Sequence, residues 1–216
     1  MTMKEHICYI VGAAPLGDAP PKPQPGDYLI AADAGYAALK NAGLEPDFVM
    51  GDFDSLGAAP EHPNVETHSV IKDDTDLMLA VRWALAQGWR RFRIYGALGG
   101  KRLDQTLASL QTLRFLKENG ADGLLVGDGW NVKLLQNGVL RFPAEAKGWL
   151  SLFTSGDKAE GVTLRGLKYE LTGAELTCTF PLGVSNEFLG RSATISVEKG
   201  SLFVLWQGEL LPEVLE

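Results

Sequence analysis

Residues 28–52, YLIAADAGYAALKNAGLEPDFVMGD, decide the class of fold. The stretch opens on an apolar run at 28–33, continues with a helix-like segment at 35–43 and closes on a second apolar run at 47–52. Short apolar runs are typical of buried strands, and Gly43 is the residue type that most often follows the last turn of a helix. A strand, a helix and a second strand in this order predict a parallel βαβ unit.

The same alternation extends on both sides of this stretch, up to about residue 128. The sequence predicts further strands at 6–12, 91–97 and 123–128, and further helices at 73–88 and 104–120. Apolar residues at 77, 78, 81, 84 and 85 give the first of these helices an amphipathic spacing. Strands that alternate with helices predict a doubly wound, mostly parallel sheet with flanking helices.

The pattern changes after residue 130. NVKLLQNGVLRF is predicted to be a hairpin that turns at Asn137 and Gly138. Short β-rich runs follow, interrupted by Gly, Asp and Pro about every ten residues, which is typical of a β-sandwich or barrel. We therefore expect an α/β domain at 1–130 and an all-β sandwich domain at 131–216.

Composition and charge narrow the class of protein. The 216 residues are 45% hydrophobic and 22% charged, and the net charge of −7 argues against nucleic acid as a main partner. Cys8 and Cys178 lie in separate apolar-rich runs and are expected to be buried free thiols. Since we find neither a signal peptide nor an apolar run of about 18 residues, we expect a cytoplasmic protein that does not bind membranes.

Charged side chains gather where the predicted strands end. In an open α/β sheet, ligands bind at the carboxyl ends of the strands. GDFDS ends one strand, KDDTD opens the helix at 73–88, and the glycine-rich GALGGKRLDQ follows the strand at 91–97. Taken singly, these segments fit an Asp-rich turn, a helix cap and a tight turn. Together they supply carboxylates for Mg²⁺, and basic groups and backbone amides for phosphates. These are the groups that an enzyme of phosphoryl transfer needs.

Five segments carry a resemblance to a known family. ADAGYAAL, PDFVMGDFDSL, KDDTDLMLAVRWAL, GALGGKRLDQTLASL and GVSNEFLG occur in this order. Together they resemble thiamine pyrophosphokinase (thiamine diphosphokinase) over about residues 28–205. The resemblance implies an ATP-binding α/β domain, a thiamine-binding β-sandwich and a homodimer with active sites between the subunits. It also implies an Mg²⁺-dependent transfer of the diphosphoryl group of ATP to thiamine, which releases AMP.

The resemblance also implies roles for individual residues. The residues placed at Mg²⁺ and the triphosphate are Asp52, Asp54 and Asp76, with Asp33, Asp73, Thr75, Lys101 and Arg102 nearby. The residues placed on the thiamine side are Asp104, Gln105, Ser185 and Asn186. Either Asp76 or Asp104 orients the thiamine hydroxyl or accepts its proton. The chain departs from the family pattern at Ala34, where glycine is usual, and at Gln105, where bacterial members often have histidine.

Two other classes of function remain open on the sequence. A metal-dependent phosphohydrolase on the same sheet would use the aspartates to activate water, and would act without thiamine. A nucleotide-binding module without catalysis would dock another protein through its β domain, but it leaves the convergence of so many acids without a physical reason.

Overall fold

The computed structural model describes residues 6–17, 20–53, 57, 59–68 and 74–215. Two predicted site residues, Asp54 and Asp73, lie outside these ranges. The chain divides into two compact units, Met1–Asp128 and Gly129–Glu216. Within the described ranges, each helix is too short or too polar to cross a membrane.

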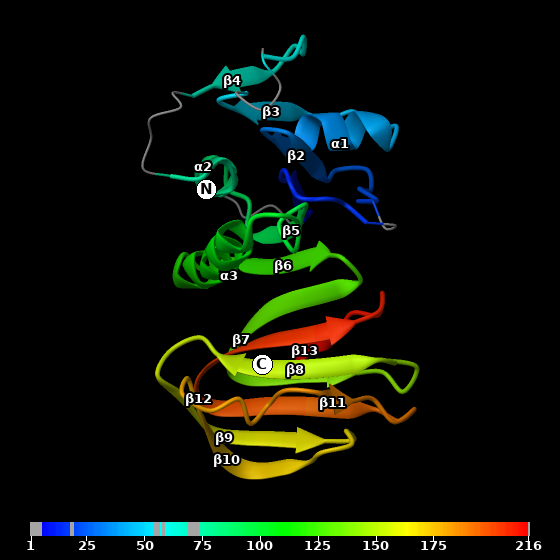
Figure 1. The fold of residues 1–216 in the computed structure, drawn as a ribbon, viewed down its shortest axis with the longest axis vertical. Helices are drawn as coiled ribbons and strands as arrows, with labels where there is room; N and C mark the ends of the chain where they lie inside the picture. The colour runs from blue at the N-terminus through cyan, green and yellow to red at the C-terminus, as the bar shows by residue number, and fades with distance from the viewer. Residues whose placement is uncertain (1–5, 18–19, 54–56, 58, 69–73, 216) are drawn as a thin grey trace. The chain divides into compact units, whose positions relative to one another are not determined.

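The first unit is built on a parallel sheet with the strand order β6-β5-β1-β2-β3-β4, most of which can be followed in Figure 1. Its strands are β1 (Cys8–Val11), β2 (Tyr28–Ala32), β3 (Phe48–Gly51), β4 (Val65–Thr67), β5 (Arg91–Tyr95) and β6 (Asp122–Gly127). Every strand pair within this order is parallel. The predicted α/β class and the mostly parallel sheet are confirmed. The short strand β4 was not predicted, because its single apolar residue leaves no periodic signal.

Three helices flank the described part of this sheet: α1 (Gly35–Asn41), α2 (Asp76–Ala86) and α3 (Leu103–Glu118). Alternate residues of the strands, among them Tyr9, Leu29 and Val49, form one buried cluster with Leu39 of α1. Because successive strand residues point to opposite faces, the intervening residues face the other side of the sheet. Helix α2 packs against β1, β2 and β3 and also contacts α3.

In the second unit, the described residues form strands without a helix. The strands are β7 (Trp130–Phe142), β8 (Trp149–Thr154), β9 (Lys158–Arg165), β10 (Leu171–Thr177), β11 (Asn186–Glu187), β12 (Ala193–Gln207) and β13 (Glu213–Leu215). The long strand β12 pairs with β7 along most of its length, with β9 over its first half and with β8 over its second half. It therefore joins the part of the sheet that holds β9 to the part that holds β8.

Aromatic packing shows that these two parts of the sheet face each other. Phe142 is paired with Ala193 at the start of β12, yet its ring centroid lies 5.3 Å from that of Trp206 near the other end of β12. A straight strand from Ala193 to Trp206 would span roughly 40 Å. Strand β12 must therefore bend back over the core. This bend folds the strands into the two layers of a β-sandwich, as predicted.

The predicted hairpin at Asn137 and Gly138 is wrong, because one continuous strand, β7, runs through both residues. Asn137 has a positive φ of 44°, but its Oδ1 accepts a hydrogen bond from Gly200 N at 2.9 Å across the strand pair. The register with β12 shifts at this point. The Asn-Gly pair thus forms a bulge that helps to bend the strands, and does not reverse the chain.

The expectation that both cysteines are buried holds for Cys8 only. Cys8 lies in the central strand β1, whereas Cys178 is exposed just after β10. β10 ends the strand order of its sheet, so most of its side chains have no second layer to cover them. An apolar-rich stretch at an edge strand is for this reason a poor indicator of burial.

Candidate active site

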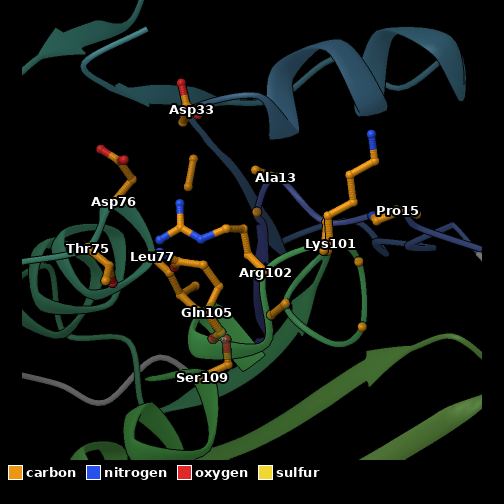
Figure 2. A pocket seen from close by; sticks show the side chains of 17 residues that line it. Ala13, Pro15, Asp33, Thr75, Asp76, Leu77, Lys101, Arg102, Gln105 and Ser109 are labelled. Atoms are coloured by element: carbon orange, nitrogen blue, oxygen red, sulfur yellow. Dashed lines mark hydrogen bonds between the residues drawn. The ribbon is translucent and has the colours of Figure 1, made fainter. Parts of the chain in front are cut away.

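A cavity of about 600 Å³ opens at the carboxyl edge of the parallel sheet (Figure 2). Four segments line it: the loop after β1, the end of β2, the start of α2, and the turn after β5 with the first turns of α3. The lining residues are Gly12, Ala13, Ala14, Pro15, Ala32, Asp33, Thr75, Asp76, Leu77, Gly96, Ala97, Gly99, Gly100, Lys101, Arg102, Gln105 and Ser109.

The strand order explains why the cavity forms here. Strand β1 lies between β2 and β5. The chain leaves β1 toward β2 on one side, whereas it leaves β5 through α3 toward β6 on the other. Two loops that depart in opposite directions leave a crevice between them, and such switch points are where open α/β sheets bind ligands.

Glycines allow these two loops to touch. A Cβ atom on Gly96 would lie 2.4 Å from Gly12 O, and a Cβ atom on Gly12 would lie 2.7 Å from Gly96 O. Gly96 also has a φ of +61°, which disfavours other residues. Backbone hydrogen bonds join the loops, from Gly12 N to Tyr95 O at 2.8 Å and from Ala14 N to Gly96 O at 2.9 Å. The cavity floor is therefore close-packed backbone.

Carboxylates occupy one side of the cavity. Asp33 adopts a positive φ of 49° directly after β2, and its backbone N donates to Met50 O at 2.8 Å. Gly51 permits this close approach, since a Cβ atom there would lie 3.0 Å from the Asp33 Cα. Asp76 is the first residue of α2, and Thr75 caps that helix by accepting a hydrogen bond from Met78 N. A threonine and not an aspartate therefore caps α2.

Basic side chains come from the glycine-rich turn. Lys101 and Arg102 both line the cavity, and Figure 2 shows Arg102 extending toward the side on which Asp33 and Asp76 lie. Arg102 also forms an ion pair with Asp104, in which its Nε donates to Asp104 Oδ1 at 2.9 Å. These hydrogen bonds from Arg102 lower the pKa of Asp104 from 3.8 to about 2. Both side chains are more than half exposed.

The remaining predicted residues of the first unit differ in whether they line the cavity and in how deeply they are buried. Gln105 lines the cavity, whereas Asp104 is not among the lining residues. Asp52 is partly buried directly after β3. Phe53, beside it, is 2% exposed and belongs to the core cluster despite a positive φ of 56°. In the part of the chain that the structure describes, no group of three or more His, Cys, Asp or Glu could hold a metal ion, and Asp54 lies outside that part.

Ser185 and Asn186 lie in the second unit and differ in their surroundings. Ser185 is exposed with a φ of +63°, and its backbone N donates to Ser151 Oγ. Asn186 is buried, and its Oδ1 accepts from Tyr169 N at 2.9 Å and Glu187 N at 3.0 Å. Its Nδ2 donates to Tyr169 O at 2.7 Å. The amide of Asn186 thus fixes the backbone that presents Ser185.

Comparison with known proteins identifies relatives of two segments of the chain. The model of the thiamin pyrophosphokinase catalytic domain matches residues 24–122, and the model of the thiamin pyrophosphokinase vitamin B1 binding domain matches residues 139–202. The thiamine pyrophosphokinase of Bacillus subtilis is 30% identical over 194 residues, which cover 82% of this chain and 85% of that protein. The chain belongs to the thiamine pyrophosphokinase family.

Solved structures of the family share the fold. The crystal structure of thiamine pyrophosphokinase from Bacillus subtilis has a TM-score of 0.82 at 28% identity, and the match covers 94% of this chain and 100% of that one. The structure of the protein from Geobacillus thermodenitrificans has a TM-score of 0.76 at 27% identity, with 94% and 98% covered.

The loop at 12–15 lines the cavity, but the sequence did not predict it as part of the site. It also lies before the residues that the thiamin pyrophosphokinase catalytic-domain model matches. A run of small residues directly after the first strand was the available signal, but it identifies a ligand site only if β1 is central in the sheet. The sequence analysis also missed Ser109. This residue lies one turn of α3 after Gln105, and its hydroxyl donates a hydrogen bond to Gln105 O at 2.8 Å.

Proposed function

We propose that this chain transfers the diphosphoryl group of ATP to the hydroxyl of thiamine, which yields thiamine diphosphate and AMP. The observation that carries the proposal is the cavity at the switch point, which sets carboxylates opposite basic side chains in a chain of the thiamine pyrophosphokinase family. Comparison with known proteins favours this reaction over a phosphohydrolase on the same sheet.

The first unit, Met1–Asp128, is proposed to be the ATP-binding catalytic domain. The triphosphate of ATP would lie along the turn after β5, where Lys101 and Arg102 supply positive charge. Three glycines of this turn, Gly96, Gly99 and Gly100, have positive φ, so backbone atoms can approach a ligand without side chains in the way. Transfer to thiamine requires in-line attack on the β-phosphorus, to which the protein contributes mainly positioning and charge neutralisation.

A magnesium ion is proposed as the cofactor, held by Asp52, Asp54 and Asp76 with Asp33 nearby. Carboxylate oxygens are the ligands that Mg²⁺ prefers, and Asp33 and Asp76 both line the cavity. When bound, Mg²⁺ would offset the negative charge of the phosphates and of these aspartates. Asp73 and Thr75 precede Asp76 in the sequence, and Thr75 orients the start of α2 through its cap.

The second unit is proposed to bind thiamine through Ser185, with Asn186 holding that backbone in place. We also propose a homodimer with the active site at the subunit interface. Exposed apolar side chains of this unit, including Trp149, Phe153 and Phe180, support an interface, because large apolar groups are costly to leave in water. The cytoplasmic location stays a prediction, which cell fractionation would test.

The test is incubation of the purified protein with thiamine and Mg·ATP, followed by chromatography of the nucleotides. AMP formed only in the presence of thiamine supports the proposal, whereas ADP, or AMP formed without thiamine, contradicts it. Asp76→Asn should lower the rate by at least about 100-fold if Asp76 neutralises or binds the reacting groups. The matched control is Asp74→Asn, since Asp74 pairs with Arg82 and is not among the cavity-lining residues.

A further inference from the structure

The ion pair between Arg102 and Asp104 has a geometry that bears on catalysis. Arg102 Nε donates to Asp104 Oδ1 at 2.9 Å and Oδ2 at 3.2 Å, and Arg102 Nη2 donates to Oδ2. Arg102 occupies the position before α3 with an extended backbone, φ −109° and ψ 92°, and its side chain makes no capping hydrogen bond. Asp104 lies in the first turn of that helix. The carboxylate of Asp104 therefore binds the edge of the guanidinium that carries Nε and Nη2.

This bidentate pairing leaves the other edge of the guanidinium available to a ligand. A guanidinium carries five N–H donors in a rigid plane. Asp104 takes the donor on Nε and one on Nη2, so the other Nη2 donor and both Nη1 donors remain for a second acceptor. Arg102 lines the cavity and extends across it in Figure 2. Two adjacent donors on a planar group match the spacing of two phosphate oxygens.

We propose that Asp104 is a positioning residue, which holds the guanidinium of Arg102 so that its outer edge faces the phosphates of bound ATP. Asp104 therefore does not accept the proton of the thiamine hydroxyl. This inference rests on the proposed function, because it assigns a part in that reaction.

Two further observations agree with this assignment. Both carboxylate oxygens of Asp104 already accept hydrogen bonds from Arg102. The pair also holds the pKa of Asp104 at about 2, whereas a general base works best with a pKa near the pH of the reaction. Since both side chains are largely exposed, the pair can bias the orientation of Arg102 but cannot lock it. Loss of Asp104 should thus have a moderate effect.

A double-mutant cycle tests the proposal. The variants are Asp104→Asn, Arg102→Ala and the combination of both, assayed for AMP formation with varied ATP and varied thiamine. Asp104→Asn alone should lower kcat/KM for ATP by roughly two- to fivefold, because a positioning role through an exposed pair is worth little more than that. It should leave the KM for thiamine unchanged. In the Arg102→Ala background it should have no further effect, because Asp104 acts only through Arg102.

Other outcomes would overturn the proposal. A base or a direct substrate contact predicts a loss of about 100-fold or more in both backgrounds, and removal of a base would also abolish the acid limb of the pH profile of kcat. No effect of Asp104→Asn in either background would equally show that the pair does not position Arg102. Glu118→Gln is the matched control, since it removes another exposed ion pair of α3, with Arg114, far along the helix from the cavity.

A binding measurement separates this proposal from the proposed function. Calorimetric titration with α,β-methylene-ATP, in which the bond that breaks is replaced, reports the contact of Arg102 with phosphates without any reaction. Asp104→Asn should weaken binding by about two- to fivefold with Arg102 present, and should not weaken it with Arg102→Ala. An equal effect in both backgrounds refutes the positioning role, whatever the wild-type protein does with thiamine. Absence of thiamine-dependent AMP in the wild type refutes only the proposed function.

Discussion

The close contact between the loops after β1 and β5 makes a sharp prediction for Gly96→Ala. The new methyl group would lie 2.4 Å from Gly12 O and 2.9 Å from Ala14 O, so the two loops must separate. Alanine at a φ of +61° costs about 1–2 kcal/mol by itself. Overpacking of a close-packed site adds about 1–3 kcal/mol. We therefore expect the free energy of unfolding to fall by about 2–5 kcal/mol.

Gly120→Ala is the matched control for the energetic cost of placing alanine at a positive φ. Gly120 has a similar φ of +65°, but a Cβ atom there meets nothing within 4 Å. This variant should lose only about 1–2 kcal/mol and keep full activity. Urea denaturation followed by circular dichroism gives both free energies, and AMP formation gives kcat/KM.

Activity should separate the two glycine variants as clearly as stability does. Displacement of the loops by about 1 Å moves the floor of the cavity, and a misplacement of that size can cost about 100-fold in rate. We expect Gly96→Ala to lose at least about tenfold in kcat/KM under conditions where it is still folded. If Gly96→Ala matched Gly120→Ala in both stability and kcat/KM, the loop contact would neither stabilise the fold nor shape the site.

Four further predictions concern other parts of the chain. Asn186→Ala should lower the free energy of unfolding by about 2–4 kcal/mol in a urea titration, because it leaves buried backbone groups of its neighbours without partners. Ser185→Ala should leave stability unchanged and mainly raise the KM for thiamine; a loss of kcat alone would argue against a ground-state contact. Phe53→Ala should cost about 3–5 kcal/mol, measured by the same titration, since its ring is 2% exposed. The Asp104 carboxyl should titrate by NMR with a pKa of about 2, and this pKa should return toward 3.8 in Arg102→Ala. Because the folded-state pKa is lowered, the pair stabilises the protein above about pH 4, and that contribution disappears as the pH falls through about 2. An unshifted titration would contradict the ion pair.

Local sequence patterns were enough to predict the fold class of each half of the chain. Apolar runs alternating with amphipathic segments are local patterns, and they sufficed to predict the β-rich second unit and, apart from the short strand β4, the described strands and helices of the first unit. The ordered motifs around Asp33, Asp76 and Arg102 were local as well, and they identified residues that the fold brings to one cavity. Chemistry that resides in residue type and spacing could thus be predicted without coordinates.

Tertiary structure decided what depends on distant partners. An Asn-Gly pair suits a hairpin, but Asn137 bonds to Gly200 from far along the chain and the strand continues. Gly12 lines the site only because β1 is central in the sheet, next to β5. Likewise, Asn186 matched a substrate-binding motif, yet its amide is engaged by the backbone of Tyr169. A local pattern reports which structures a segment can form, whereas the strand order and the long-range hydrogen bonds select the one that buries and satisfies its groups.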